Sequence, residues 1–265
     1  MFLTAVLPSC GMSKPEVEYV IDIVDKTTDA AGKVLLLGFP DVGLVGAIAV
    51  SYLIEKLRLA EAGYIDAEDL PPIVAVHSAN VKELIRIYEG RRIVTVFSEV
   101  PIPIPALRPL AQGLIEWASD KGMDGIISIT GLAEPRRLDI EVPKVYAVGS
   151  NAEYTDRLTR LVDAEMFRDG YVAGINAELL RGGMRRGGNV GVVLAQSHFN
   201  YPDPGAAATV IRHLPKVIGE EVDVNPLLES AEAIRIQMRD LMRRTQEAMK
   251  AVQKSKEMEL PPVYM

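Results

Sequence analysis

Short apolar runs alternate with longer segments of helical period along most of the chain. Residues 33–37 are a mostly apolar run that ends at Gly38, which is typical of a buried strand, and residues 44–59 then place apolar side chains at helical spacing. The alternation continues to about residue 218. We predict strands at residues 17–24, 33–37, 73–77, 84–88, 91–97, 125–130, 144–148, 171–173 and 189–195, and helices at 44–59, 106–121, 152–166, 175–180 and 203–218.

Strands separated by crossover helices favour a mainly parallel sheet with helices on both faces. Residues 84–88 and 91–97 are the exception, because they flank Glu89-Gly90, a two-residue signal for a hairpin. The chain is therefore predicted to be an α/β protein, with a mainly parallel sheet sandwiched by helices and one antiparallel hairpin inserted in it.

The pattern changes after Val222. Asn225-Pro226 is a helix start signal, and neither Gly nor Pro interrupts the chain from there to Met258. We predict three parts: an α/β body at residues 1–222, one long heptad helix at 223–258 and an extended, proline-containing tail at 259–265. Two arrangements are open for this helix. It forms a weak coiled coil or docks on a neighbouring subunit, or it folds back on its own body. Its predicted apolar stripe is Leu227, Ala231, Ile234, Met238, Leu241, Thr245, Ala248 and Val252.

Composition excludes several classes of function. Among 265 residues, 36 are acidic and 29 basic, and a net charge of −7 argues against nucleic-acid binding through a broad basic face. One cysteine and three histidines exclude a disulfide framework and a Cys-rich zinc site, so we expect no metal and no cofactor. No window approaches 18 uncharged apolar residues, so we expect no membrane span and a cytoplasmic protein. Met1 and Met12 are both possible starts.

The turn at residues 38–46, GFPDVGLVG, joins a predicted strand to a predicted helix, where phosphate sites often lie. It matches neither GxGxxG nor a P-loop, which excludes a nucleotide-driven motor. Gly43 and Gly46 either let the helix pack closely on the sheet or bind an anion. A second glycine-rich segment, RGGMRRGG at 181–188, is expected to be a basic, flexible loop that is either a solvated turn or a contact for an acidic partner or RNA.

Four chemically versatile residues follow predicted strands: Asp41, Glu99, Glu134 and His198. The carboxyl ends of parallel strands meet at one edge, so these residues are candidates for one cleft. Carboxylates and an imidazole suit general acid–base work on a nucleoside or a small anion. Alternatively, each carboxylate caps a helix or pairs with the neighbouring arginines, and His198 is a hydrogen-bonded loop residue. We assign no catalytic residue.

Two segments carry a family resemblance. Residues 38–46 and 201–207, YPDPGAA, with Glu99 and Pro101 between them, resemble the proteasome assembly chaperone family, whose archaeal members are homologues of the second eukaryotic assembly chaperone. The resemblance covers residues 20–219. It implies a nucleoside-phosphorylase-like α/β fold and a family whose members are not known mainly as enzymes.

The last three residues, Val263, Tyr264 and Met265, are similar to the HbYX motif of proteasome activators and some archaeal assembly chaperones. This resemblance implies that a terminal carboxylate pairs with a lysine between neighbouring α subunits, while the tyrosine hydroxyl hydrogen-bonds a backbone group and the valine is buried. Several such tails on a homo-oligomer would bind through avidity.

We therefore expect a homo-oligomeric, ATP-independent chaperone that binds proteasome α subunits or the assembled α ring, with no nucleic acid or membrane partner. The first alternative is an enzyme that processes a nucleoside or a carboxylate in the cleft. The second is an oligomeric scaffold for another partner.

Overall fold

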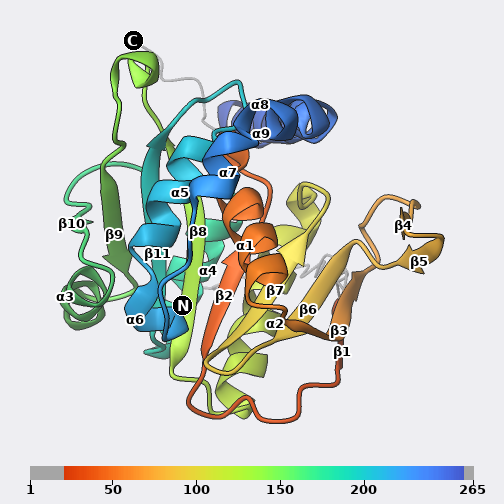
Figure 1. Ribbon diagram of the computed structural model, residues 1–265. Helices are drawn as coiled ribbons and strands as arrows, with labels where there is room; N and C mark the ends of the chain where they lie inside the picture. Colours follow the sequence, from red (N-terminus) through yellow and green to blue (C-terminus); the bar gives the residue numbers. More distant parts are fainter. Residues whose placement is uncertain (1–20, 260–265) are drawn as a thin grey trace, which may run out of the picture.

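The computed structural model describes the backbone of residues 21–259 and the side chains of residues 21–251 (Figure 1). Nine strands form one mixed sheet, and two short strands, β4 (Ala75–His77) and β5 (Asn80–Lys82), pair with each other outside it. The order across the large sheet is β1 (Ile21–Asp25), β3 (Ala60–Ala67), β6 (Ile85–Glu89), β7 (Ile93–Ser98), β2 (Val34–Gly38), β8 (Gly125–Ala133), β11 (Val190–Ser197), β9 (Val145–Gly149) and β10 (Glu165–Met166).

The four central strands, β7, β2, β8 and β11, run parallel, which confirms the predicted α/β class. The antiparallel part is larger than the single hairpin that we predicted. Strands β6, β3 and β1 continue the sheet in antiparallel pairs, and β9 runs antiparallel to β11. Strand β3 was not predicted, because its sequence AEAGYIDA lacks a continuous apolar run.

Alternating side chains of β2 contact the two helical layers. Leu36 packs with Ile48 of α1 (Val45–Lys56), whereas Leu35 and Leu37 pack with Leu110 of α2 (Ile104–Asp120). One face is covered by α1, α3 (Ala152–Leu161), α5 (Pro204–Arg212) and α6 (Pro215–Ile218); the other by α2 and α4 (Gly174–Arg186).

Two predictions for the glycine-rich part of the chain were wrong. Residues 171–173 form no strand and lead into α4, and residues 181–186 are the last turns of α4, not a loop. The helix ends at Gly187, which has a φ of 71°. Its interior glycines permit close packing: a Cβ on Gly183 would lie 2.7 Å from Val190. The predicted helices at 152–166 and 203–218 are also shorter, because β10 follows α3 and α6 is separate from α5.

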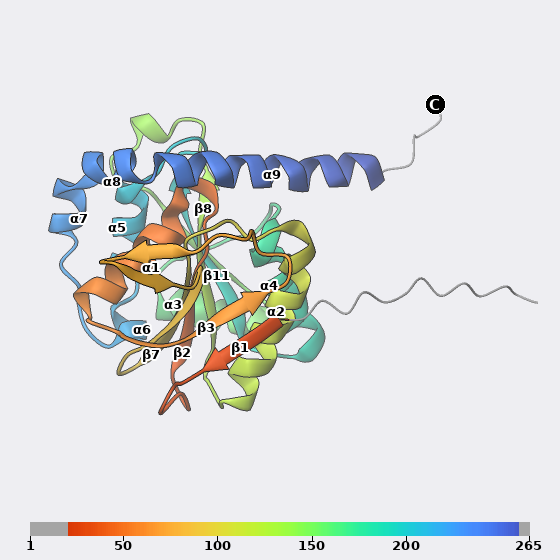
Figure 2. The same cartoon turned by 90° about the vertical axis from the view of Figure 1, so that its right-hand side faces the viewer.

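The C-terminal segment forms three helices: α7 (Asn225–Glu229), α8 (Ala231–Gln237) and α9 (Arg239–Glu259). The predicted unbroken helix was wrong, because Ser230 and Met238 have ψ values of 9° and 5°, outside the α-helical range. The breaks let α7 to α9 pack on their own body, where Leu227, Met242 and Thr245 are at most 2% exposed. Figure 2 shows α9 lying along one end of the body and its last turns extending beyond it.

No helix between residues 21 and 259 is both long and apolar enough to cross a bilayer.

Candidate functional site

The turn after β2 packs tightly against β8 and β11. It contains a short 3-10 helix, η1 (Val42–Leu44), in which Gly43 has a φ of 61°. A Cβ on Gly43 would collide with the hydroxyl of Ser197, and a Cβ on Gly46 would collide with the carbonyl of Ile129. Both glycines therefore allow the start of α1 to approach the sheet.

Asp41, in the same turn, belongs to a network that reaches α4. Its Oδ2 accepts hydrogen bonds from Thr130 Oγ1 at 2.8 Å and from Asn176 Nδ2 at 2.9 Å. The Oδ1 of Asn176 in turn accepts a bond from Ser128 Oγ at 2.6 Å. Burial in this site raises the pKa of Asp41 above its ordinary value, because loss of contact with water disfavours the charged carboxylate. The network ties the turn to β8 and α4.

Helix α9 covers the carboxyl edge of the sheet beside Asp41. A cavity of about 40 Å³ remains between the turn, the loop at Pro101 and the α9 residues Thr245 and Met249. The open cleft that the sequence predicted at this edge is therefore covered at Asp41 by the chain's own C-terminal helix. Sequence reasoning could not reveal this, because the position of α9 depends on contacts between segments about 200 residues apart.

Glu99 lies in a different environment, at the end of β7. Its carboxylate pairs with Arg86 of β6, and the same oxygen lies 2.8 Å from Nε2 of His77 in β4. The Arg86 side chain is 6% exposed and its guanidinium lies 5.8 Å from the centre of the Phe97 ring. The Glu99 carboxylate thus anchors the β4–β5 hairpin to the sheet.

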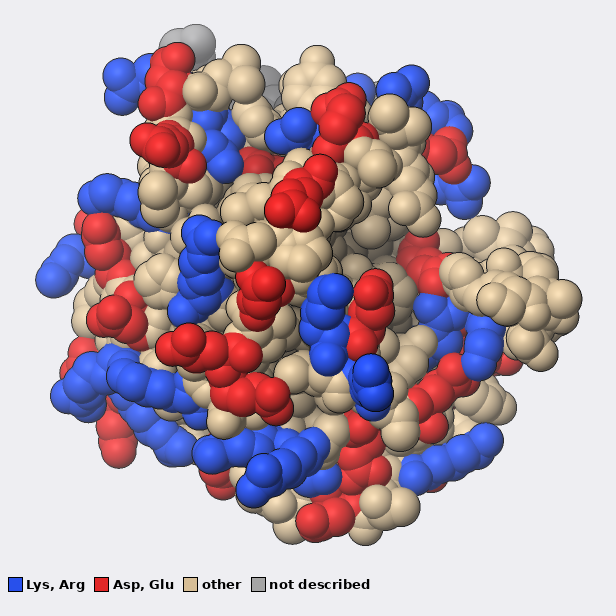
Figure 3. Space-filling model, in the orientation of Figure 1, with Lys and Arg blue, Asp and Glu red and all other residues tan. Residues whose placement is uncertain are grey.

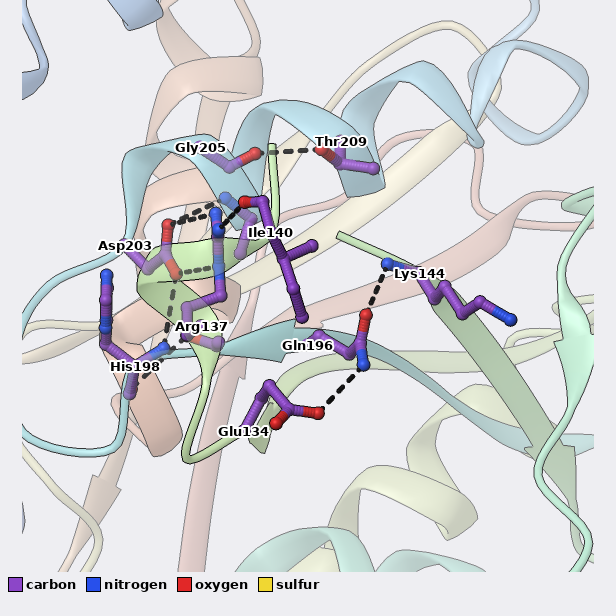
Figure 4. A network of polar contacts seen from close by, with 11 residues as sticks. Glu134, Arg137, Ile140, Lys144, Gln196, His198, Asp203, Gly205 and Thr209 are labelled. Carbon is purple, nitrogen blue, oxygen red and sulfur yellow. Dashed lines mark hydrogen bonds and ion pairs between the residues drawn. The ribbon is translucent and has the colours of Figure 1, made fainter. Parts of the chain in front are cut away.

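Figure 4 shows the third group, in the loops after β8 and β11. Arg137 forms a bidentate ion pair with Asp203, with Nε to Oδ2 at 2.8 Å and Nη2 to Oδ1 at 3.2 Å, and both side chains are buried. Asp203 also caps α5 by accepting a bond from the backbone N–H of Ala206, and its own N–H donates to the carbonyl of Gly43 at 2.9 Å. The two segments that carry the family resemblance are therefore in direct contact.

Glu134 and His198 lie near this ion pair but in separate contacts. Glu134 accepts a hydrogen bond from Gln196 Nε2 at 3.0 Å, and the His198 ring packs edge-on against Tyr201 with centroids 6.2 Å apart. Partial burial lowers the pKa of His198. Asp41, Glu99, Glu134 and His198 thus have different hydrogen-bond partners and do not form one acid–base group.

His198 and Tyr201 line a groove of about 590 Å³ between their loop, Leu138 and helices α8 and α9. We name it the Arg-lined groove, because Arg235, Arg239 and Arg243 form its wall. Between residues 21 and 251, no cluster of three or more His, Cys, Asp or Glu side chains is placed to hold a metal ion. The predicted tail residues Val263, Tyr264 and Met265 lie outside the described residues.

The central parallel strands, the helices on both faces and the docked C-terminal helices define an α/β protein whose sheet edge is covered by its own chain. The chain belongs to the PAC2 family, whose sequence model matches residues 35–242, from β2 to α9. The predicted resemblance to proteasome assembly chaperones is thereby confirmed at the level of the family.

Solved structures share this fold over most of the chain. The crystal structure of Pyrococcus furiosus PbaA, described as an archaeal homolog of proteasome-assembly chaperone, is 25% identical with a TM-score of 0.80, covering 87% of this chain and 100% of PbaA. P. furiosus PbaB, described as an archaeal proteasome activator, has a TM-score of 0.71 at 22% identity, over 83% of this chain and 98% of PbaB. An uncharacterized protein of Methanocaldococcus jannaschii is 26% identical over 208 residues, 78% of this chain and 84% of that protein.

Proposed function

We propose that this protein is a cytoplasmic, ATP-independent proteasome-binding chaperone. It acts as a homo-oligomer and inserts Val263, Tyr264 and Met265 into pockets of the proteasome α ring. Membership of the PAC2 family and the similarity to PbaA support a role at the proteasome. The similarity to PbaB supports the shared fold alone.

The observation that carries the tail mechanism is the course of α9. Its first half is fixed to the body through Met242 and Thr245, while its last turns extend past the body (Figure 2). The described part of α9 therefore ends beyond the α/β body. A tail attached there reaches a partner without displacing any strand or helix of the α/β body.

Avidity explains why an oligomer is part of the proposal. One tail of three residues buries little surface, so a single contact is weak. Tails on one oligomer bind at high effective concentration once the first has docked, and such linkage raises overall affinity by about 10²- to 10⁴-fold.

Co-sedimentation with assembled proteasome α rings tests the proposal. We expect the full chain to co-sediment, and a chain lacking residues 263–265 to lose binding while it keeps its oligomeric state. One glycine added after Met265 displaces the carboxylate and should have the same effect, whereas Tyr264→Phe should weaken binding partly. Tyr171→Phe is the matched control, because Tyr171 is 99% exposed and far from the tail in sequence. Undiminished binding without residues 263–265 would contradict the tail mechanism.

No feature of the described residues favours the enzymatic alternative specifically. The four candidate cleft residues have separate partners, and α9 covers the edge beside Asp41. Capture of other proteins and no proteasome subunit by the tagged full chain would support the scaffold alternative instead.

A further inference from the structure

The β4–β5 hairpin projects from the body with an apolar surface. Val74, Val76 and Val81 are each at least 60% exposed, and Ile73 beside them is 44% exposed. In Figure 3 this hairpin is the uncharged tan lobe at the right-hand side. Its two strands of three residues each pair with one another and with no other strand between residues 21 and 259, and an isolated two-stranded hairpin is marginally stable in water. Such a surface is typical of a protein–protein contact.

The Arg-lined groove is a second exposed apolar surface, elsewhere on the molecule. Leu138 is 89% exposed, Tyr201 65% and Ile236 57%, and Met242 lies at the groove's buried base. The groove's volume of about 590 Å³ falls within the range of roughly 300–1,000 Å³ that binding pockets usually have. No hairpin residue lines this groove, although His77 of β4 lines a separate cavity with Ile234 and Gln237 of α8.

The residues that flank the hairpin are mainly acidic, whereas the groove is lined mainly by arginines. The segment from residue 66 to 83, which contains the hairpin, has four carboxylates and one lysine, and that lysine, Lys82, already pairs with Glu61 at 2.6 Å. Three arginines and one glutamate line the groove. Arg239 among them makes no ion pair with any side chain between residues 21 and 251. Arginine is well suited to pair with carboxylates across an interface.

We propose that the hairpin of one copy inserts into the Arg-lined groove of a second copy of this chain. Val76 and Val81 would cover the apolar floor, and the carboxylates at Glu68 and Asp69 would face the arginines. The two surfaces differ, so the contact is heterologous, and repetition around an axis closes a ring. The inference rests on the homo-oligomer of the proposed function and identifies the surfaces that form it.

Two variants test the contact. Val76→Glu disables the hairpin, and Ile236→Glu disables the groove while leaving the hairpin intact. The unaltered chain is expected to be an oligomer by native mass spectrometry, and each variant alone a monomer. Tyr171→Glu is the control at an exposed position outside both surfaces and should remain oligomeric. Circular dichroism and urea unfolding confirm that each variant is folded.

Mixing the two variants gives the sharpest result. A hairpin-disabled copy still offers a groove, and a groove-disabled copy still offers a hairpin, so a 1:1 mixture should form one productive contact and a heterodimer. A monomeric unaltered chain, an oligomer that survives Val76→Glu, or a mixture that stays monomeric would each overturn the proposal. Deleting residues 263–265 leaves both surfaces intact. Failure of the 1:1 mixture to form a heterodimer would therefore contradict the hairpin–groove contact alone. Undiminished α-ring binding after the deletion would contradict the tail mechanism alone.

Discussion

The ion pair between Arg137 and Asp203 connects the loop after β8, the loop after β11 and the turn at Gly43. The Asp203 carboxylate holds Arg137, caps α5 and accepts a bond from the N–H of His198, while the Arg137 Nη1 donates to the carbonyl of Ile140 at 2.6 Å. Both charges are almost fully buried, so each depends on the other for compensation. This pair fixes the loops after β8 and β11 against the turn at Gly43.

Replacing Asp203 by alanine should destabilise the protein strongly. The substitution leaves the Arg137 guanidinium buried without its counter-charge and removes the cap of α5, and we expect a loss of about 3–5 kcal/mol in the free energy of unfolding by urea denaturation. Glu165→Ala is the control, because its ion pair with Lys144 is more than half exposed, and it should leave stability nearly unchanged. A loss from Asp203→Ala no larger than that of the control would contradict the role assigned to the pair.

Asp41 should give stability a pH dependence. Burial raises its pKa in the folded protein above the ordinary 3.8, so above pH 3.8 the folded state retains a proton that the unfolded chain loses. The free energy of unfolding should therefore fall as pH rises from 3.8 through the raised pKa of the folded state. Asp41→Asn keeps an acceptor for Thr130 and Asn176 and should remove this dependence. Identical pH profiles for the two proteins, measured by urea unfolding, would contradict the prediction.

At the scale of elements, strongly patterned segments could be predicted and context-dependent ones could not. The sequence predicted β2, α1 and the β6–β7 hairpin, because an apolar run, a helical period and Glu89-Gly90 are local signals. Helix α4 was predicted too short, because glycines usually disfavour helices. In the fold, Gly182 and Gly183 are tolerated because they bring α4 close to Ile115 and Val190.

The position of the C-terminal helices likewise could not be predicted from local sequence signals. Their heptad pattern indicated an apolar stripe but not its partner, and the structure places the first part of it against the chain's own body. Met242, which follows Leu241 and was not part of the predicted stripe, is 2% exposed in this contact. Met242→Ala should cost at least about 2 kcal/mol in the free energy of unfolding, because the substitution leaves a cavity. Met184→Ala, at a position 63% exposed, is the control that should change little. Equal effects of the two substitutions in urea unfolding would show that α9 does not depend on this contact.

At the scale of the whole molecule, the family could be predicted from two short segments because they meet in the fold. The backbone N–H of Asp203 donates to the carbonyl of Gly43, 160 residues earlier in the sequence. The two segments therefore belong to one structural unit. The acid–base cleft could not be resolved from sequence, since strand order alone does not show where the loops fold. Glu99 pairs with Arg86 of β6 and His77 of β4, whereas Asp41 accepts hydrogen bonds from Thr130 and Asn176.

The architecture separates a rigid body from the segment proposed to bind. The proposed self-association surfaces lie on the β4–β5 hairpin and on α8 and the first part of α9, and the last described turns of α9 extend past the body (Figure 2). Binding should therefore depend on two separable properties, the oligomer and the tail. Val76→Glu should weaken α-ring binding by loss of avidity, while a chain lacking residues 263–265 should lose binding as an intact oligomer.

Photo-cross-linking from position 263 tests the central claim most directly. A photoreactive side chain in place of Val263, in the otherwise unaltered chain mixed with assembled proteasome α rings, should cross-link to residues that line the pockets between neighbouring α subunits. The same group in place of Tyr171 should give no such product. Cross-links from position 263 that map elsewhere on the α ring, or none while the chain still co-sediments with it, would contradict the account.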